Sequence, residues 1–411
     1  MDSEGSDVEN GMEHETVEVY EDGPIDQQLA DGDGEEEGEA EPVQDDAIKA
    51  IYGHEKDVFC VSTSKTGRWL ATGGEDDRAQ IWDLTNQSDD PVLTIQHNDS
   101  VVSTAFNHSS TLLATADLSG RIVITQLSDL SMRTEIADSS DIEWMEWHRG
   151  SDILFAGDSD GTLWMWLISQ AGVAQQKVYS AGSSPASAGH LLQDGRRLLV
   201  GYSDGQSKLW NLGDQSNCSL SCRSPVVAIT SSTVSPLAAI GYENGNVFLV
   251  NTTPAENAGG GTLRVLDKYL APGADTRRRG RPEDPEMEVD EAEEIGTAVE
   301  SLQFSALHPW LAVGRNDGSV TVYDTQTQGM TRFSATNEGG MAVCRLFWLG
   351  YRLLTASVDG RIRLYDVRSG QMTRELCCGG DDILDMAIVE EEPQLKLVVA
   401  CSGGAVRFMD C

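Results

Sequence analysis

The side chains of this chain that could do chemistry are mainly carboxylates. The sequence holds 67 Asp and Glu against 29 Lys and Arg, which gives a net charge of −38 over 411 residues. Carboxylates can serve as general acids and bases, or they can form charge-assisted hydrogen bonds with cationic partners. A chain this acidic produces carboxylate pairs by chance, and its seven His are scattered along the sequence. We therefore expect a binding protein without enzymatic activity.

Cysteine offers a second kind of chemistry, as a metal ligand or in a disulfide. The eight cysteines form two close groupings, Cys218 with Cys222 and the adjacent Cys377 and Cys378. Neither grouping has a His at metal-ligand spacing, so the sequence predicts no metal and no cofactor. The first residues, Met1-Asp2-Ser3-Glu4, have neither the basic nor the apolar part of a secretory signal. We expect reduced thiols in a cytoplasmic protein, and a nuclear pool is left open.

The charge balance also predicts the kind of partner. A strongly acidic surface repels phosphate backbones and anionic membrane surfaces, and it attracts basic proteins. No run of 18 apolar residues occurs, so we expect no membrane span. The sequence therefore predicts no direct contact with nucleic acid and favours a basic polypeptide as the partner of a monomeric protein.

A repeat must position these side chains. In the first repeat, Gly53-His54 precedes Thr72 and Asp76, and Trp82-Asp83 ends it. This spacing is the signature of a WD40 repeat, in which such side chains hydrogen-bond across turn and strand and lock a four-stranded blade. Positions equivalent to Trp82 recur at Thr125, Trp166, Trp210, Val250, Tyr323, Tyr365 and Met409.

The spacing of these positions sets the number of blades. Six of the seven gaps lie between 40 and 44 residues, as one propeller blade requires, and one gap is 73. Turn aspartates expected to lock the blades recur at Asp160, Asp204, Asp317 and Asp359. A strand at 48–52 could complete the last blade, which lacks a fourth strand of its own. The predicted fold class is an all-β WD40 β-propeller of eight four-stranded blades, closed by an N-terminal strand.

Two segments fall outside the repeat. Residues 1–46 are rich in Asp and Glu and lack Lys and Arg, so they are expected to form a disordered acidic tail. Residues 254–295 carry an arginine run beside an acidic run, which predicts a flexible charged insertion between blades five and six. The propeller is expected to span 47–411. The tail could serve solubility alone or could help to gather a basic partner.

Binding is predicted on one face of the propeller. The loop that leads into each inner strand and the turn before each third strand share that face, and both are rich in carboxylates. The predicted contacts for a basic peptide are Glu55, Asp57, Glu75, Asp99, Asp141, Glu143, Trp144, Glu300, Asp381, Asp382 and Asp385. Further acidic residues on this face, and its basic exceptions, are Asp117, Asp158 and Glu243, and Lys56, Arg315 and Arg345. Trp144 could stack on a guanidinium or belong to the core of its blade.

Four strings go beyond the generic repeat. They are Val58-Phe59-Cys60-Val61-Ser62 with 72–77, Asp141-Ile142-Glu143-Trp144-Met145-Glu146-Trp147-His148, Thr162-Leu163-Trp164-Met165-Trp166, and 193–197 with 201–205. Together they resemble the angio-associated migratory cell protein family. Its fungal relatives include the dedicated chaperone of the large-subunit ribosomal protein L10 (uL16 class). The resemblance implies that an acidic top face holds the basic N-terminal segment of that ribosomal protein during large-subunit assembly. It also implies an association with cell migration.

One motif favours a different function. The string Leu364-Tyr365-Asp366-Val367-Arg368 resembles the Trp-Asp-x-Arg box of propellers that act as substrate receptors for cullin-type ubiquitin ligases, although Tyr replaces Trp. A signalling scaffold is the second alternative. The scaffold predicts several unrelated partners with little salt dependence, whereas a chaperone for a basic segment predicts binding that weakens steeply with salt.

Overall fold

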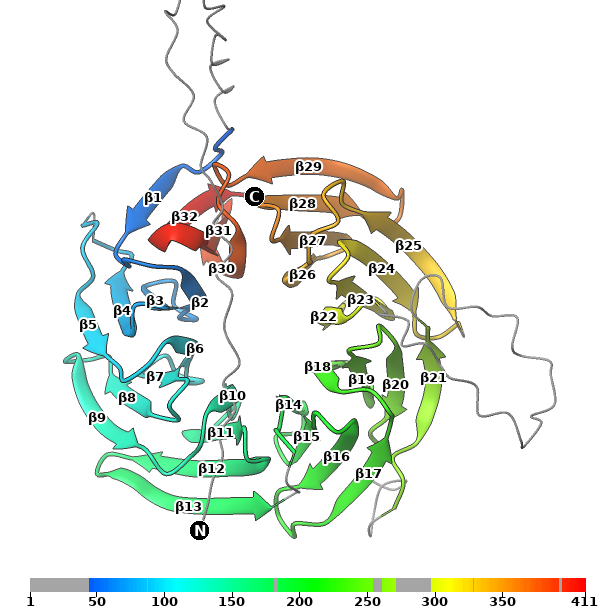
Figure 1. Ribbon diagram of the computed structural model, residues 1–411, viewed down its shortest axis with the longest axis horizontal. Coiled ribbons are helices and arrows are strands. Elements are labelled where there is room, and N and C mark those ends of the chain that lie inside the picture. The colour runs from blue at the N-terminus through cyan, green and yellow to red at the C-terminus, as the bar shows by residue number, and fades with distance from the viewer. Residues whose placement is uncertain are drawn as a thin grey trace, which may run out of the picture. The chain divides into compact units, whose positions relative to one another are not determined.

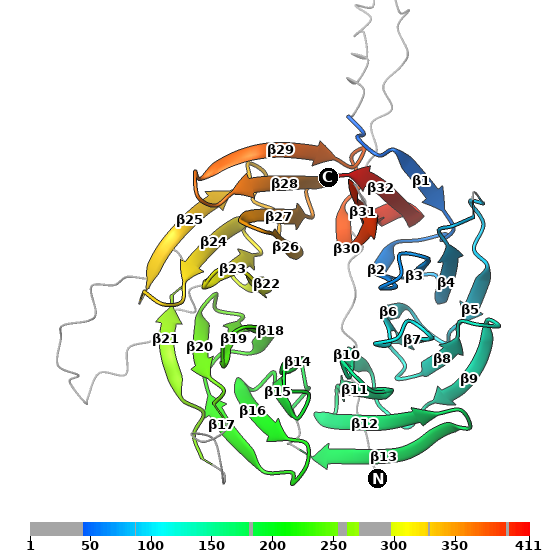
Figure 2. The ribbon, with the colours of Figure 1, turned by 180° about the vertical axis from the view of Figure 1, so that it is seen from behind.

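The described residues form a closed ring of β-sheets. The structure, a computed structural model, describes residues 44–86, 88–180, 184–253, 261–270, 297–327, 329–391 and 394–411. They build eight four-stranded antiparallel sheets arranged as a β-propeller, and the strands nearest the centre are β2, β6, β10, β14, β18, β22, β26 and β30 (Figure 1). The view from behind shows the same order of blades (Figure 2). The all-β, eight-bladed fold predicted from the sequence is thereby confirmed.

The first four blades each use four consecutive strands, from the inner strand to the outer one. Blade one comprises β2 (Val58–Thr63), β3 (Trp69–Gly74), β4 (Arg78–Asp83) and β5 (Leu93–Gln96). Blade two comprises β6 (Val101–Phe106), β7 (Leu112–Asp117), β8 (Ile122–Gln126) and β9 (Ser131–Ile136). Blade three comprises β10 (Ile142–Trp147), β11 (Ile153–Asp158), β12 (Thr162–Ser169) and β13 (Gly172–Ser180). Blade four comprises β14 (Ala188–Leu191), β15 (Arg197–Gly201), β16 (Gln206–Asn211) and β17 (Asn217–Ser221).

The last four blades follow the same plan, except that the eighth takes its outer strand from the start of the described chain. Blade five comprises β18 (Val226–Ser231), β19 (Leu237–Tyr242), β20 (Val247–Asn251) and β21 (Val265–Tyr269). Blade six comprises β22 (Val299–Phe304), β23 (Trp310–Arg315), β24 (Ser319–Asp324) and β25 (Met330–Thr336). Blade seven comprises β26 (Arg345–Leu349), β27 (Arg352–Ser357), β28 (Arg361–Asp366) and β29 (Gln371–Cys377). Blade eight comprises β30 (Ile383–Glu391), β31 (Gln394–Cys401), β32 (Ala405–Asp410) and β1 (Lys49–Tyr52).

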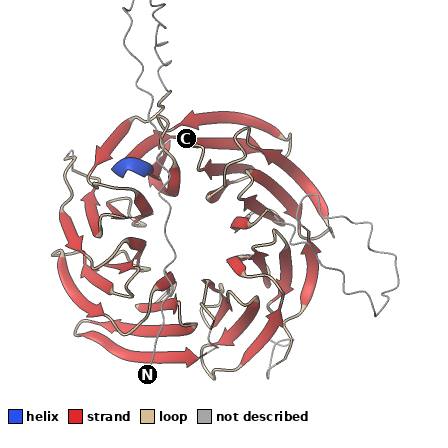
Figure 3. Ribbon diagram, in the orientation of Figure 1, coloured by secondary structure: helices blue, strands red, loops and turns tan. Residues whose placement is uncertain are grey.

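Helical structure in the described chain is limited to one 3-10 turn, Ser402–Gly404, drawn in blue in Figure 3. None of the described residues belongs to a helix with the length and apolarity that a membrane crossing needs.

The strand register follows the repeat in the sequence. Trp82 on β4 pairs with Leu70 on β3. The seven positions aligned with Trp82 occupy the same place in their blades, in the pairs Thr125↔Leu113, Trp166↔Leu154, Trp210↔Leu198, Val250↔Ala238, Tyr323↔Leu311, Tyr365↔Leu353 and Met409↔Leu397. Each pair puts two side chains on the same face of its blade, where the next blade covers them.

Close packing between blades explains the composition of the second strands. Every residue of β3, β7 and β23 is buried, because neighbouring blades cover both faces of these strands. Gly73 lies against Val101 of the next blade, and a Cβ atom at Gly73 would overlap that side chain. Gly241 has the same relation to Val299 in blade six. The missing side chain therefore lets the inner strand of the next blade approach.

The ring closes between blade eight and the start of the described chain. β1 pairs antiparallel with β32, with Ile51 opposite Val406. Just before β1, Asp46 binds blade seven, because its N donates to Cys377 O at 2.9 Å and its Oδ2 accepts from Cys377 N at 2.8 Å. The N-terminal strand therefore supplies the fourth strand of blade eight.

Two predicted boundaries need correction. Residues 44–46 were expected in the acidic tail, but they contact blades seven and eight; the rest of the tail, 1–43, lies outside the described residues. Residues 265–269 were expected in the flexible insertion, but they form the outer strand of blade five. Their side chains alternate between buried or half-buried and exposed, as is typical of an outer strand. In the sequence, the charged runs that follow hide this short strand. Residues 254–260 and 271–296 of the insertion also lie outside the described residues.

Candidate functional site

One backbone hydrogen bond recurs in all eight blades and defines a common face. It joins the b–c turn, between the second and third strands of a blade, to the d–a loop, which leads into the inner strand of that blade. In blade one, Glu75 N donates to Asp57 O at 2.9 Å. The other seven donor–acceptor pairs are Leu118–Ser100, Ser159–Asp141, Ser203–Pro185, Glu243–Pro225, Asn316–Ala298, Val358–Ala342 and Ser402–Asp382. We call the surface made by these loops and turns the d–a face.

A β-bulge adds a third repeated position at the mouth of the ring. The pairing of the inner strand skips one residue in six blades, and the skipped residues are Phe59, Val102, Glu143, Val227, Glu300 and Leu384. The extra residue of a bulge is left out of the strand ladder. Because neighbouring blades cover both faces of a blade, an exposed side chain at this position reaches the mouth of the central channel. Glu143 and Glu300 are exposed in this way.

These three kinds of position collect carboxylates without cationic partners. Five exposed carboxylates at these positions form neither an ion pair nor a side-chain hydrogen bond with another described residue, namely Asp141, Glu143, Glu243, Glu300 and Asp382. Partial burial raises the pKa of Glu143, and the nearby charges of Asp141 and Asp158 act in the same direction. Partial burial also raises the pKa of Glu300, although its side chain reaches solvent. These five carboxylates therefore keep their charge without a cation from the described residues.

Other predicted contacts on this face already have partners. Glu55 pairs with Arg78 at 2.9 Å, Glu75 lies 3.5 Å from the Lys56 ammonium, and Asp381 pairs with the buried Arg407. Glu55 and the Lys56–Glu75 pair are largely exposed, so solvent screening leaves these pairs weak and a stronger cation could replace them.

The two remaining aspartates of the d–a loops make only backbone contacts with their side chains. Asp57 accepts from Gly403 N at 2.8 Å, which joins the d–a loop of blade one to the b–c turn of blade eight. Asp99 is exposed and accepts from Ser100 N at 2.7 Å. Both carboxylates keep acceptor capacity for an additional donor.

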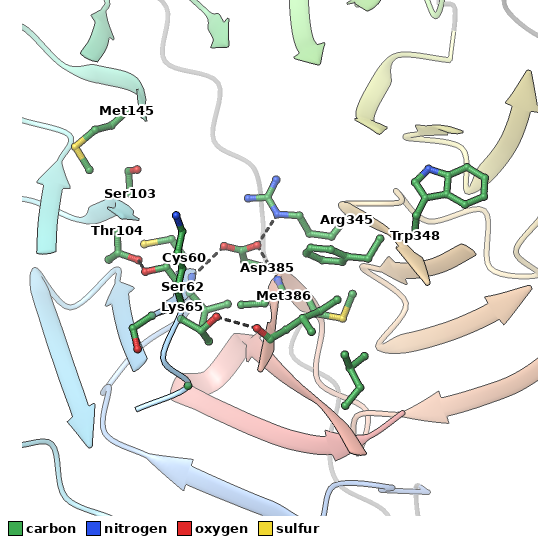
Figure 4. A pocket seen from close by; sticks show the side chains of 18 of the residues that line it. Cys60, Ser62, Lys65, Ser103, Thr104, Met145, Arg345, Trp348, Asp385 and Met386 are labelled. Carbon is green, nitrogen blue, oxygen red and sulfur yellow. Dashed lines mark hydrogen bonds and ion pairs between the residues drawn. The ribbon is translucent and has the colours of Figure 1, made fainter. Parts of the chain in front are cut away.

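Asp385 is not available to a partner. Its side chain is buried, accepts from Val61 N at 3.0 Å and forms an ion pair with Arg345, so it joins blades seven, eight and one (Figure 4). It lies on the wall of a channel cavity of about 930 Å³, which Ser62, Thr104 and Met145 also line. Asp385 was predicted to contact a peptide, but its role is structural. The sequence could not show this role, because the partners of Asp385 lie in other blades.

Trp144 also belongs to the packing between blades. Its indole lies against Gly157 of its own blade and Gly189 of blade four, where any Cβ would overlap it. The same string joins its neighbours through Glu146, which accepts from Leu191 N at 2.9 Å, and through Trp147, which donates to Ala105 O at 2.9 Å. Of the two predicted roles of Trp144, the geometry favours the core. Glu143, at the bulge of this segment, is exposed instead.

The predicted lock of blade one is present. The His54 ring binds Thr72 Oγ1 at 2.8 Å and Asp76 Oδ1 at 2.9 Å, and Trp82 Nε1 donates to Thr72 Oγ1 at 3.2 Å. Burial lowers the pKa of His54, and the hydrogen bond to Asp76 opposes that shift. The imidazole therefore serves as a neutral structural group.

Blade two repeats this lock with a different aspartate. His97 binds Thr115 at 2.8 Å and Asp117 at 3.1 Å. Asp117 was placed on the partner-binding face, but it is fully buried. Burial alone would raise its pKa, yet hydrogen bonds from His97, Ser119 and two backbone amides lower it to about 2. Asp158 is likewise buried, where it accepts from Trp164 Nε1 at 2.6 Å.

The remaining turn aspartates stabilise single turns or strands. Asp204 accepts from Gln206 N and Asp317 from Ser319 N, both at 2.9 Å. Asp359 pairs with Arg363 at 2.6 Å, and Asp160 accepts from the Ser140 hydroxyl of its d–a loop. These contacts are structural. They use the carboxylate oxygens as acceptors within the turn or strand.

The expected basic exceptions do not form a positive patch on the d–a face. Arg315 is fully buried, and its guanidinium hydrogen-bonds Gly245 O, Thr321 and Tyr323 at 3.3–3.4 Å. Arg345 faces the channel and is paired with Asp385. Lys56 remains, opposite Glu75.

Comparison with known sequences shows the family of this chain. The sequence model of the WD domain, G-beta repeat, matches residues 46–83 and 294–324. The angio-associated migratory cell protein of Homo sapiens is 33% identical over 370 residues, which cover 87% of this chain and 78% of that protein. This chain belongs to the angio-associated migratory cell protein family. The resemblance predicted from the Glu143–Trp147 segment and the other strings is thereby confirmed.

Two fungal proteins are similar to this family member at lower identity. The ribosome assembly protein SQT1 of Saccharomyces cerevisiae is 20% identical over 363 residues, which cover 82% of this chain and 78% of that protein. A crystal structure of Chaetomium thermophilum Sqt1 bound to the N-terminus of the ribosomal protein L10 matches with a TM-score of 0.74 and 20% identity. That match covers 90% of this chain and 100% of the other. The structural likeness shows the shared propeller fold.

The box that resembles a ligase-receptor motif has local contacts. Arg368 pairs with Asp366 at 3.2 Å, and its guanidinium lies 3.3 Å from the centroid of the Tyr351 ring. Tyr365 is buried in the core between blades six and seven. These contacts account for the motif as the end of one strand and the start of a turn.

Proposed function

We propose that this protein binds the basic N-terminal segment of a ribosomal protein through the carboxylates of the d–a face, without catalysis. In this role it keeps that segment from other polyanions and from aggregation until the ribosomal protein joins the large subunit. The proposal is supported by the similarity to SQT1, a ribosome assembly protein, and to a Sqt1 structure that holds the N-terminus of L10. Such a role places the protein in the cytoplasm as a monomer that does not contact nucleic acid directly.

The observation that carries the proposal is a set of exposed carboxylates at the repeated positions that form neither an ion pair nor a side-chain hydrogen bond with another described residue, namely Asp141, Glu143, Glu243, Glu300 and Asp382. Lys or Arg of a peptide would form charge-assisted hydrogen bonds with these groups. The raised pKa values of Glu143 and Glu300 indicate sites where an added cation removes an unfavourable interaction. Binding of a cation should therefore lower both pKa values.

The net charge of −38 supports fast capture. A long-range negative potential steers a positive segment towards the ring and raises the association rate, and salt screens that effect. Residues 1–43, which hold acidic side chains and no Lys or Arg, would add to this potential.

A pulldown from cell lysate tests this function. The tagged protein is used as bait at low and at high salt, and the bound proteins are identified by mass spectrometry. We expect one basic ribosomal protein of the large subunit to dominate at low salt and to be depleted at high salt. Recovery of many unrelated partners at both salt concentrations would support a general scaffold instead. The variant Arg368→Ala serves as a control, because only a ligase receptor should lose partners with it.

A further inference from the structure

Apolar side chains interrupt the carboxylates in one sector of the d–a face. In blade two the three repeated positions hold Ser100, Leu118 and Val102, so none of them is acidic. Leu118 is 41% exposed, and Val102 lines the mouth of the channel cavity. Phe59 of blade one occupies the same bulge position as Val102 and is half-buried. Blade two therefore presents an apolar sector without a carboxylate, whereas blades one, three, five, six and eight each carry at least one carboxylate at these positions. Blade seven also lacks one, but its b–c turn holds the half-buried Val358 in place of an exposed Leu.

Folding does not account for the exposed leucine. Six of the seven positions equivalent to Leu118 are polar, namely Glu75, Ser159, Ser203, Glu243, Asn316 and Ser402. The backbone amide makes the same hydrogen bond in all of them, so the turn does not need an apolar side chain. Contact of an exposed Leu side chain with water is unfavourable. That contact is removed when an apolar group of a partner covers the side chain.

The apolar sector is bounded by carboxylates on both sides. The b–c turn that holds Leu118 contacts the d–a loop of blade three, where Ser139 Oγ donates to Gly120 O at 2.8 Å; that loop leads to Asp141 and Glu143. On the other side, the turn of blade one contacts the d–a loop of blade two, where His97 N donates to Asp77 O at 2.8 Å. That turn carries Glu75.

We infer that the d–a face selects a basic segment in which an apolar side chain is flanked on both sides by Lys or Arg. The apolar side chain lies over Leu118 and Val102, and the flanking cations reach the carboxylates of blade one and blade three. This inference rests on the proposed function, because it specifies which basic segment the same face takes. An acidic ring alone attracts any polycation, so the apolar contact supplies the discrimination between basic sequences.

Two synthetic peptides of equal charge test the inference. Both contain Arg and Lys on each side of a central residue, which is Leu in one peptide and Ser in the other. We expect the wild-type protein to bind the Leu peptide about fivefold to tenfold more tightly at low salt, because the central side chain buries apolar area. In the variant Leu118→Ser, and in the nearly isosteric Val102→Thr, this ratio should fall towards one.

Met341→Ser is the matched control. Met341 is 42% exposed in the d–a loop of blade seven, whose repeated positions Ala342, Val358 and Cys344 carry no carboxylate. The preference for the Leu peptide should persist in this variant. Thermal unfolding of each variant checks that the ring is intact, and Leu118→Ser should be tolerated because the side chain is exposed.

The outcomes separate the inference from the function beneath it. Equal binding of both peptides by the wild-type protein would overturn the inference and leave the proposed function standing. A preference that survives both Leu118→Ser and Val102→Thr would also overturn it. Failure of both peptides to bind the wild-type protein at low salt would contradict the proposed function itself, and the inference would fall with it.

Discussion

Asp117 and Glu143 show how the same chemical group takes opposite roles within neighbouring blades. Asp117 is buried and accepts hydrogen bonds from His97, Ser119 and two backbone amides, which lower its pKa to about 2. Glu143 is exposed, has no cation among the described residues, and has a raised pKa. The first carboxylate stabilises its own fold. The second, under the proposed function, binds a cation of the partner, and its position at the bulge distinguishes it from the first.

The lowered pKa of Asp117 predicts how the acid stability of the ring changes. Its pKa is about 2 in the folded protein and near 3.8 when unfolded, so its contribution is complete above pH 4 and is lost as pH falls towards 2. We expect Asp117→Asn to lower the free energy of unfolding at pH 7 by about 2 kcal/mol. Urea unfolding measures this. Asp99→Asn, at an exposed site of the neighbouring loop, should change it little; equal stability of Asp117→Asn and wild type would contradict the assignment.

The raised pKa values of Glu143 and Glu300 predict a pH dependence of binding. A carboxyl group with a raised pKa takes up a proton at higher pH than an ordinary Glu, and only its ionised form attracts a cation. Affinity for a basic peptide should therefore begin to fall above the pH at which ordinary Glu residues titrate. In Glu143→Gln with Glu300→Gln, Kd at pH 7 should rise about tenfold and this pH dependence should weaken. Fluorescence anisotropy across pH 5 to 7 measures both effects, with the exposed Asp90→Asn as control.

At the scale of strands and turns, local signals in the sequence predicted the blades well. The alignment on Trp82 gives the observed register in every blade, and the His54–Thr72–Asp76 lock is present as its residue types indicate. These features depend on residues within one repeat. Contacts between blades could not be predicted in the same way: Asp385 binds the backbone of Val61, 324 positions away, and no local pattern marks it.

The site itself was predictable only in part, for the same reason. Glu143 and Glu300 were identified from their place before an inner strand, and both are exposed at the mouth. Leu118 and Val102, which we propose as apolar contacts, carry no charge, so a pattern of carboxylates in the sequence does not mark them. The bulge could have indicated Val102 in the sequence. At the start of an inner strand, two successive residues such as Phe59 and Cys60 break the alternation of inward and outward side chains.

Packing between blades gives a prediction at this scale. Replacing a strand Gly by Ala usually stabilises a sheet slightly, because Gly costs more conformational entropy on folding. At Gly73 the sign should reverse, because the added Cβ would overlap Val101 of the next blade. We expect Gly73→Ala to lower the free energy of unfolding by about 1–3 kcal/mol, measured by urea denaturation. Gly261→Ala, where nothing lies within 4 Å of the added atom, should have little effect. Unchanged stability at Gly73 would show that the blades can separate without cost.

At the scale of the whole molecule, the fold turns a repeat into a ring of equivalent positions with unequal chemistry. One backbone hydrogen bond in each blade fixes the d–a face, and the side chains at those positions vary freely because the backbone makes the contact. Carboxylates lie at some blades, and apolar groups lie at blades two and seven. A rigid ring can therefore present a fixed pattern of charge to a flexible segment, which limits the ordering cost to the partner.

The most direct measurement is calorimetric titration of the ring with a synthetic N-terminal segment of the large-subunit ribosomal protein L10 from the same organism. We expect one site per ring. We also expect Kd to rise about tenfold or more when salt increases from about 0.05 M to about 0.5 M, because the contacts are charge pairs at the surface. Glu143→Lys with Glu300→Lys should abolish binding while the thermal unfolding of the ring is preserved. Tight binding by that double variant, or a Kd independent of salt, would contradict the assignment of the d–a face as the binding site.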